Sequence, residues 1–283
     1  MGREYKVLSN LNRSFDKAPK TYVFCEDIQV LGAPFYIMEK VQGHILTAKA
    51  AIKNEVSPQA FKTVSDTWLN TFVAFHGIDY QKVGLEDLGR PKGYVERQVS
   101  NWGKQYMAAA TDDVPAAQKV MKWMDENQPE SYDHTLIHND FKYDNVVFSD
   151  DSWLTISAIL DWEMCTLGDP LMDLGTSLGY WTTADDADFM KQGLPSPTVM
   201  PGNPSRSEIV HQYALKSGRS VDNIVFYYAY GLFKIAVIAQ QIYYRYKHGH
   251  TQDPKFANLN KAAALCCNNA WQAIQKNKID NLY

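Results

Sequence analysis

Near its middle, the chain carries a short polar segment directly before two strand-like apolar runs. Residues 138–145 read HNDFKYDN, and the apolar runs follow within residues 146–160. Two such runs separated by a few polar residues are typical of a β-hairpin. The first residue of one hairpin strand lies roughly opposite the last residue of the other. We therefore expect Asn145 and Asp161 to meet at the open end of the hairpin, with Asp140 in the loop before it.

The side chains of Asp140, Asn145 and Asp161 carry carboxylate and amide oxygens, which are ligands that Mg²⁺ prefers. Kinases use an aspartate as the base and, after four intervening residues, an asparagine as a metal ligand. Asp140 and Asn145 have this spacing, and Lys142 lies where protein kinases place a lysine that faces the γ-phosphate. A plain solvated turn is the alternative, and His138 is expected to support the loop rather than to react.

The N-terminal part of the chain predicts a small unit of one helix and two strands. Residues 3–11 have apolar side chains at helical spacing. Two strand candidates follow at 21–27 and 33–41, and a short segment joins them. We expect these strands to pair antiparallel.

Beyond Gly43 the pattern is mainly helical. A serine followed by proline at 57–58 is a favourable helix start, and apolar residues then recur at helical spacing. Further helices are expected at about 93–110, 115–127, 222–246 and 258–275. A stretch rich in proline and glycine at 193–207 is expected to form a surface loop.

The overall composition narrows the class of function. The formal net charge is −4 and the isoelectric point is near 6.0, so the chain lacks the basic surface that nucleic-acid binding requires. Its four cysteines have no paired spacing and its N-terminus has no signal-peptide pattern, which predicts reduced thiols and a cytoplasmic location. The apolar segment 224–244 contains Lys234, so we expect a buried helix there and no membrane span.

Four separated segments carry a resemblance to a known family. They are PFYIMEKVQG at 34–43, GLEDLGRPKGYVERQ at 84–98, ILDWEMCTLGDPLMDLG at 159–175 and IAVIAQQIYYRYKHGHTQD at 235–253. Together they resemble the aminoglycoside phosphotransferase and choline kinase family of small-molecule kinases, and more narrowly the phosphotransferase domains associated with acyl-CoA dehydrogenases. The resemblance implies an α+β, two-lobed, protein-kinase-like fold. Residues 1–43 would form an incomplete N-terminal lobe, and residues 44–283 a mainly helical C-terminal lobe that holds the catalytic hairpin.

The resemblance also implies a nucleotide site between the two lobes. ATP would place its adenine against a hinge, mainly on backbone groups, and Asp140 would act as the base with Lys142 beside the transferred phosphate. The hinge residues implied are Met38, Glu39 and Val41, and the implied Mg²⁺ ligands are Asn145, Asp161 and, in an outer position, Glu163. Asp169 and Asp173 would instead cap and anchor the helix that follows. The sequence does not decide whether the nucleotide is ATP or GTP.

The acceptor implied by the resemblance is a hydroxyl group on a small molecule. In the narrower group, a hydroxyacyl compound or its CoA thioester is the leading suggestion. Tyr180 and Trp181 lie where related kinases line the acceptor pocket, although aromatic residues are also common in a core. Arg97 is a candidate for binding a carboxylate or phosphate of the acceptor, and a surface ion pair is an equal alternative.

One part of the family pattern is expected to be missing before the first helix. Family members have a nucleotide-covering loop there, and a strand whose lysine pairs with a helix glutamate at the place of Glu4. Without that lysine we expect weak or no activity, whether the chain is truncated, starts elsewhere or is a degenerate kinase. A binding module that turns nothing over is therefore the alternative function. The small sheet would also have an open edge, through which we expect a homodimer.

Overall fold

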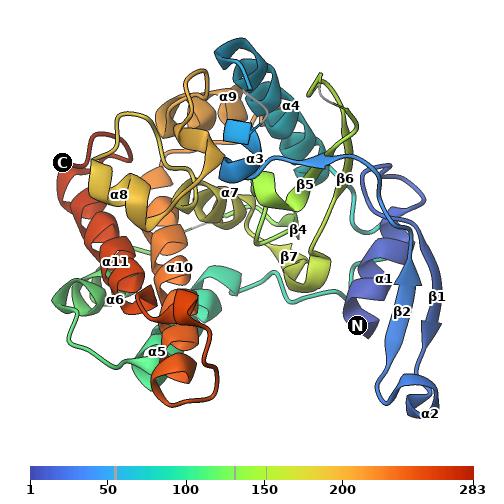
Figure 1. Cartoon of the computed structure of the whole chain (residues 1–283), viewed down its shortest axis with the longest axis horizontal. Helices are drawn as coiled ribbons and strands as arrows, with labels where there is room; N and C mark the ends of the chain where they lie inside the picture. The colour runs from blue at the N-terminus through green and yellow to red at the C-terminus, as the bar shows by residue number, and fades with distance from the viewer. Residues whose placement is uncertain (54–55, 131, 151) are drawn as a thin grey trace.

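The structure, a computed structural model, describes residues 1–53, 56–130, 132–150 and 152–283. Figure 1 shows a small sheet unit, called the small lobe below, beside a larger helical body, called the large lobe. The small unit contains α1 (Gly2–Leu11), β1 (Thr21–Cys25), α2 (Ile28–Leu31) and β2 (Phe35–Met38). The two strands pair antiparallel, with Cys25 opposite Phe35. α1 packs against both strands. The predicted helix and the predicted strand pair are thus confirmed.

The larger body is mainly helical, with short strands at its centre (Figure 1). Its helices are α3 (Ala48–Lys53), α4 (Pro58–His76), α5 (Tyr94–Ala109), α6 (Pro115–Glu126), α7 (Pro170–Gly179), α8 (Asp188–Gly193), α9 (Arg206–Ser217), α10 (Ile224–Lys247) and α11 (Leu259–Lys276). Short 3₁₀ turns lie at η1 (Tyr143–Asn145), η2 (Trp162–Met164), η3 (Pro197–Val199) and η4 (Pro254–Phe256). The helices expected from the apolar spacing are all present.

Two small antiparallel sheets bring the polar loops together. β5 (Val146–Phe148) pairs with β3 (His44–Ile45) on one side and with β6 (Ile156–Ile159) on the other, and β4 (Thr135–Ile137) pairs with β7 (Thr166–Gly168). Val146 lies opposite Ile159, and Ile137 lies opposite Thr166. Segments 138–145 and 160–165, which connect these strands, therefore lie at the same end of both sheets. The predicted hairpin is confirmed.

Local capping explains where several helices start. The Ser57 side chain accepts a hydrogen bond from the Ala60 amide, with a proline as the first helical residue. Asp169 caps α7 in the same way through the Leu171 amide, as expected. α9 begins with a reciprocal capping box between Ser205 and Glu208. That helix was not expected, although its capping signal is present in the sequence.

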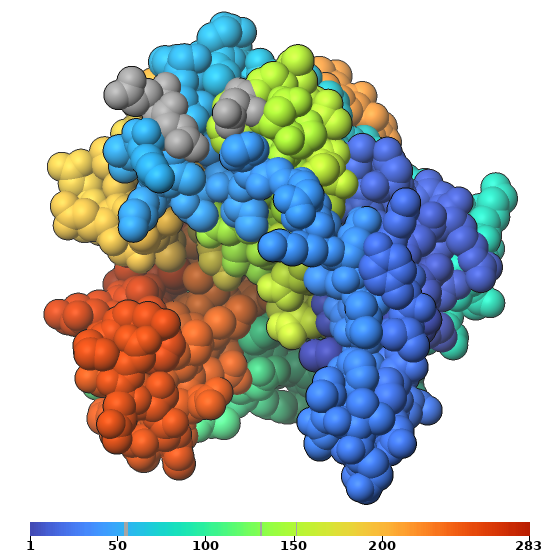
Figure 2. All heavy atoms as spheres, turned by 45° about the vertical axis from the view of Figure 1, so that its right-hand side comes forward, coloured from blue at the N-terminus to red at the C-terminus, as the bar shows by residue number. Residues whose placement is uncertain are grey.

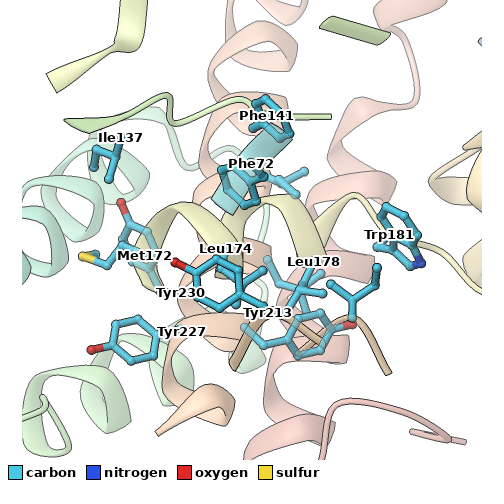
Figure 3. Close-up of a cluster of buried hydrophobic side chains, with 14 of the residues drawn as sticks. Phe72, Ile137, Phe141, Met172, Leu174, Leu178, Trp181, Tyr213, Tyr227 and Tyr230 are labelled. Carbon is cyan, nitrogen blue, oxygen red and sulfur yellow. The ribbon is translucent and has the colours of Figure 1, made fainter. Parts of the chain in front are cut away.

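α10 is the central helix of the large lobe and packs against α11, α7, α5 and α6. Most of its residues are buried, as predicted for a core helix. Among the described helices, none combines the length and hydropathy that a membrane span requires. Figure 3 shows the neighbouring core, where the rings of Phe72 and Phe141 stack with centroids 4.3 Å apart. This stack ties α4 to the polar loop, because Phe141 follows Asp140 directly.

The small lobe exposes a large share of its apolar side chains. The exposed residues are Tyr22, Val23, Ile28, Val30, Leu31, Ile37 and Met38. Exposed apolar side chains on a two-stranded sheet and on the short helix between its strands suit contact with another protein surface. The homodimer expected through this sheet stays a prediction.

Two glycines allow α7 and α10 to touch through their backbones. A Cβ atom on Gly231 would lie 2.0 Å from the carbonyl oxygen of Gly175, and one on Gly175 would lie 2.1 Å from that of Tyr227. Real side chains do not approach a backbone oxygen this closely, so any larger residue must push the helices apart.

We predict that Gly231→Ala lowers the free energy of unfolding by about 2–4 kcal/mol, because the new methyl group has no space between α7 and α10. Urea denaturation monitored by circular dichroism measures this change. The control is Gly103→Ala in α5, where the nearest atom to the new methyl group, Sδ of Met121, would lie at an ordinary contact distance of 3.6 Å. That variant should gain about 0.5–1 kcal/mol from helix propensity. Equal stability of the two variants would contradict the prediction.

Candidate active site

The loop formed by residues 138–145 is held in place by the buried carboxylate of Asp173 on α7. This carboxylate accepts hydrogen bonds from the His138 amide at 2.6 Å and from the Asn139 amide at 2.7 Å. It also contacts Nε2 of His76 at 3.1 Å. Burial alone would raise the pKa of Asp173, but the bonds from His76 and the His138 amide hold that pKa below its ordinary value. Asp173 is therefore an ionised anchor, and it anchors the loop 138–145 to α7, whereas the sequence had suggested an anchor for the helix alone.

His138 supports this loop from inside the protein. Its ring is fully buried, and Nε2 lies 3.0 Å from the carbonyl oxygen of Leu160. The ring also packs edge-on against Trp162, with centroids 5.0 Å apart. Burial lowers the pKa of His138, so a neutral imidazole is favoured at neutral pH. These contacts agree with a supporting role.

Asp140 lies at the centre of a small hydrogen-bonded group. Its carboxylate accepts from Nζ of Lys142 at 2.8 and 3.0 Å and from Nδ2 of Asn145 at 2.7 Å. Nδ2 of Asn145 also donates to the main-chain oxygen of Asp140 at 2.9 Å. The Asp140 side chain is 17% exposed, so a substrate can reach it. The three residues that the sequence grouped by spacing are thus in direct contact.

The open end of the hairpin places Asp161 beside Asn145. The amide of Leu160, the residue before Asp161, donates to the main-chain oxygen of Asn145 at 2.8 Å. Asp161 has a left-handed backbone with φ of 64°, and its side chain is exposed. The next residue, Trp162, is buried and donates from Nε1 to the Ile159 oxygen at 2.7 Å. The chain therefore turns sharply here and leaves the Asp161 carboxylate at the surface.

The residues at this end suit a Mg²⁺ ion only in part. In the described ranges, no group of three His, Cys, Asp or Glu side chains lies close enough to hold a metal. Mg²⁺ commonly binds one or two carboxylates and completes its octahedron with water and substrate phosphates. Asp161 and the Oδ1 oxygen of Asn145 fit that pattern, since Nδ2 of Asn145 is already bonded to Asp140. Glu163 is exposed two residues further on.

Glu4 of α1 faces this site through a tyrosine of the small lobe. The negative charges of Glu4 and Asp161 both act on the Tyr36 hydroxyl, which donates a hydrogen bond to Sδ of Met38 at 3.8 Å. Burial and these two negative charges raise the pKa of Tyr36 well above its ordinary value. Glu4, Tyr36 and Asp161 therefore gather where the two lobes meet. Lys6, on the same helix, instead forms an ion pair with Asp87 at 2.6 Å.

The predicted hinge connects β2 to the large lobe. Glu39 exchanges backbone and side-chain bonds with Lys20, because its amide donates to the Lys20 oxygen at 2.8 Å and its Oε1 accepts from the Lys20 amide at 3.0 Å. The Glu39 side chain is thus held by the small lobe. Met38 is exposed and Val41 is half-buried. Figure 2 shows the surface hollowed between the small lobe, in blue, and the helices in red.

A cavity of about 230 Å³ lies directly beside the loop, and we call it the acceptor cavity. It is lined by Lys142, Tyr143, Asp144, Ser177, Tyr180, Trp181 and the segment 193–196 with Thr198. Nζ of Lys142 lies 4.6 Å from the centroid of the Tyr180 ring. The same lysine thus contacts both Asp140 and this cavity, and the expected Tyr180 and Trp181 form part of its wall.

Two further expectations concern the surroundings of the acceptor. Arg97 is absent from the cavity lining, and its guanidinium donates to the main-chain oxygens of Arg90 and Lys92 at the start of α5. The stretch 193–207 is not simply a surface loop, because Pro197 and Thr198 are buried and Thr198 donates to the Thr182 oxygen at 2.7 Å. Apolar residues among its prolines were the signal for this packing.

Comparison with known proteins relates the chain to phosphotransferases. The profile of the phosphotransferase enzyme family, APH, matches residues 1–196. Acyl-CoA dehydrogenase family member 11 of Gallus gallus is 36% identical over 273 residues, covering 93% of this chain and 34% of the relative. Member 10 of Mus musculus is 30% identical and covers 97% of this chain and 25% of the relative. The chain thus spans about a third or less of these relatives.

Solved structures share the fold. A Ralstonia eutropha protein named as an aminoglycoside phosphotransferase has a TM-score of 0.84 and 30% identity, over 97% of this chain and 83% of that one. An ethanolamine kinase of Plasmodium vivax has a TM-score of 0.60 and 13% identity, over 94% of this chain and 72% of that one. The loop, the hairpin and the matched profile lead to one conclusion: the chain belongs to the phosphotransferase enzyme family and has its protein-kinase-like fold.

Proposed function

We propose that this protein is a small-molecule kinase that transfers the γ-phosphoryl group of ATP to a hydroxyl group of its acceptor. The observation that carries the proposal is the position of Asp140, which bonds Asn145 on the hairpin side and Lys142 on the cavity side. A base for phosphoryl transfer must reach both the acceptor hydroxyl and the phosphate. Membership of the phosphotransferase family supports this chemistry.

The role of Asp140 follows from its contacts. An acceptor hydroxyl in the cavity would donate a hydrogen bond to the Asp140 carboxylate, which orients the oxygen and takes its proton as the bond to phosphorus forms. Asn145 and Lys142 hold the carboxylate in one orientation. The ammonium of Lys142 also supplies a positive charge on the side where the transferred phosphate would lie.

The nucleotide would bind between the lobes, where Glu4, Tyr36 and Asp161 gather. Asp161 and Oδ1 of Asn145 would hold Mg²⁺, with Glu163 in an outer position. When bound, Mg²⁺ neutralises charge on the nucleotide phosphates. The adenine would lie against the hinge near Met38 and Val41, on backbone groups, because the Glu39 side chain is bonded to Lys20.

A hydroxyacyl compound, or its CoA thioester, is the acceptor that we propose. The relatives named as acyl-CoA dehydrogenases support this class, since those proteins carry a region similar to this chain. The acceptor cavity also suits such a compound, because it combines the rings of Tyr180 and Trp181 with the polar groups of Lys142 and Ser196. Its volume of about 230 Å³ would admit the hydroxyl-bearing end of an acyl group.

Asp140→Asn should lower turnover at least about a hundredfold, because the amide cannot take the proton of the acceptor hydroxyl. ADP formation with Mg·ATP and a panel of hydroxyacyl-CoA thioesters and free hydroxy acids measures this loss. The affinity for Mg·ATP should change by less than about threefold. Asp150→Asn, at an exposed carboxylate, is the matched control and should keep full turnover. Full activity of Asp140→Asn would refute its role as base.

Calorimetric titration with Mg·ATP tests the nucleotide site. The wild-type chain should bind, and Asp161→Ala should weaken binding at least about tenfold, because it removes a Mg²⁺ ligand. Asp150→Ala should bind like the wild type. If the folded wild-type chain binds no Mg·ATP, the kinase proposal fails, and the alternative of a binding module for another ligand gains support.

Leu194→Trp should fill part of the acceptor cavity and raise KM for an accepted hydroxyacyl compound at least about tenfold, while KM for Mg·ATP stays the same. Steady-state kinetics with each substrate varied in turn measures both values. Leu215→Trp on α9 is the matched control, since Leu215 is exposed and does not line the cavity. An unchanged acceptor KM in Leu194→Trp would show that the acceptor binds elsewhere.

A further inference from the structure

A lysine in the middle of the core helix α10 is directed at the loop 138–145. The side chain of Lys234 is only 1% exposed. Its Nζ donates to the main-chain oxygen of Asn139 at 2.7 Å and to Oδ1 of the same residue at 3.1 Å. The main-chain oxygen of Asn139 belongs to the peptide group that leads into Asp140. Lys234 therefore fixes the orientation of the peptide on which the proposed base is carried.

The two helices that touch at their glycines hold this loop through opposite charges. The Asp173 carboxylate on α7 accepts hydrogen bonds from the amides of His138 and Asn139, and the Lys234 ammonium on α10 donates one to the Asn139 carbonyl. Asn139 has a left-handed backbone with φ of 69°, which is uncommon outside glycine and needs support from its surroundings. Asn139 is thus bonded at its amide, its carbonyl and its side chain.

A buried lysine at position 234 lowers the stability of the fold if its side chain serves only to fill space. Burying an ammonium group costs several kcal/mol unless it is well paired, and an apolar residue of similar length would fill the same space. Burial lowers the pKa of Lys234 to about 8, while Asp173 and Asp140 act in the opposite direction. The ammonium form therefore predominates at neutral pH. The Trp102 ring lies 5.8 Å away and also favours a cation.

We propose that Lys234 is a positioning residue for phosphoryl transfer: it holds the Asn139–Asp140 peptide so that the Asp140 carboxylate stays bonded to Lys142, which lines the acceptor cavity. This inference rests on the proposed function, because it assigns Lys234 to the base of that reaction. Among the described residues, the hydrogen bonds of Lys234 go to Asn139, and neither of these two residues is part of the acceptor-cavity lining or a proposed metal ligand. Its effect should therefore appear in the rate of transfer and not in the binding of the nucleotide.

The test compares Lys234→Met with Gln240→Met, which removes another buried polar group from the same helix. Gln240 donates to the Ala109 oxygen and to Thr111, far along α10 from the loop. Lys234→Met should lower kcat at least about tenfold with KM for Mg·ATP within about twofold. Gln240→Met should keep the wild-type kcat, even if its melting temperature falls by as much as that of Lys234→Met. Lys234→Arg, which keeps a buried cation, should recover part of kcat.

Hydrogen–deuterium exchange of the peptide covering 138–145 gives a second readout that needs no substrate. Exchange there should rise in Lys234→Met and stay at the wild-type level in Gln240→Met. A kcat in Lys234→Met no lower than in Gln240→Met, or unchanged exchange in this peptide, overturns the proposal. If the wild-type chain shows no turnover, the proposed function fails, and the exchange comparison still decides whether Lys234 holds the loop.

Discussion

The site depends on one buried carboxylate. Asp173 has no exposed surface, and it is ionised because the amides of His138 and Asn139 and the ring of His76 bond to it. A buried anion without these donors would be strongly destabilising, so the loop and the carboxylate need each other. Once the two amides are fixed, the loop must turn at Asn139 and present Asp140 to the outside. The position of Asp140, the proposed base, thus depends on an interaction made entirely inside the protein.

The contacts at the centre of the candidate site could be predicted from the sequence because they depend on short-range spacing. Asp140 and Asn145 are five positions apart in one loop, and their contact follows from the turn between them. Asp161 could be placed because antiparallel strands bring the start of one beside the end of the other. The capping role of Asp169 was also local. The two-lobed fold came from the resemblance and is shared by the solved structures.

Other parts of the site could not be predicted because they join distant segments. The contact between Glu4 and Tyr36 depends on how α1 packs on the small sheet, and the contact between Lys234 and Asn139 joins residues 95 positions apart. Arg97 is an anion-binding candidate by residue type, and in the fold its guanidinium donates to two main-chain oxygens that precede α5, which no local sequence signal predicted. The segment from Gly193 to Thr198 has the composition of a loop and was predicted to lie on the surface, yet it is packed against the acceptor cavity.

Two walls of that cavity differ in origin, and Ser177, Tyr180 and Trp181 complete the lining. One wall is the loop with Lys142, where any change would disturb the proposed base, and the other is the segment from Gly193 to Thr198, which carries none of the proposed catalytic groups. Mutations in the second wall can alter the shape and polarity of the cavity while the phosphoryl-transfer residues stay in place. Natural selection could therefore change the acceptor of such an enzyme in small steps, each of which retains a working catalyst. Protein engineering of this chain toward a different alcohol would begin at the same segment.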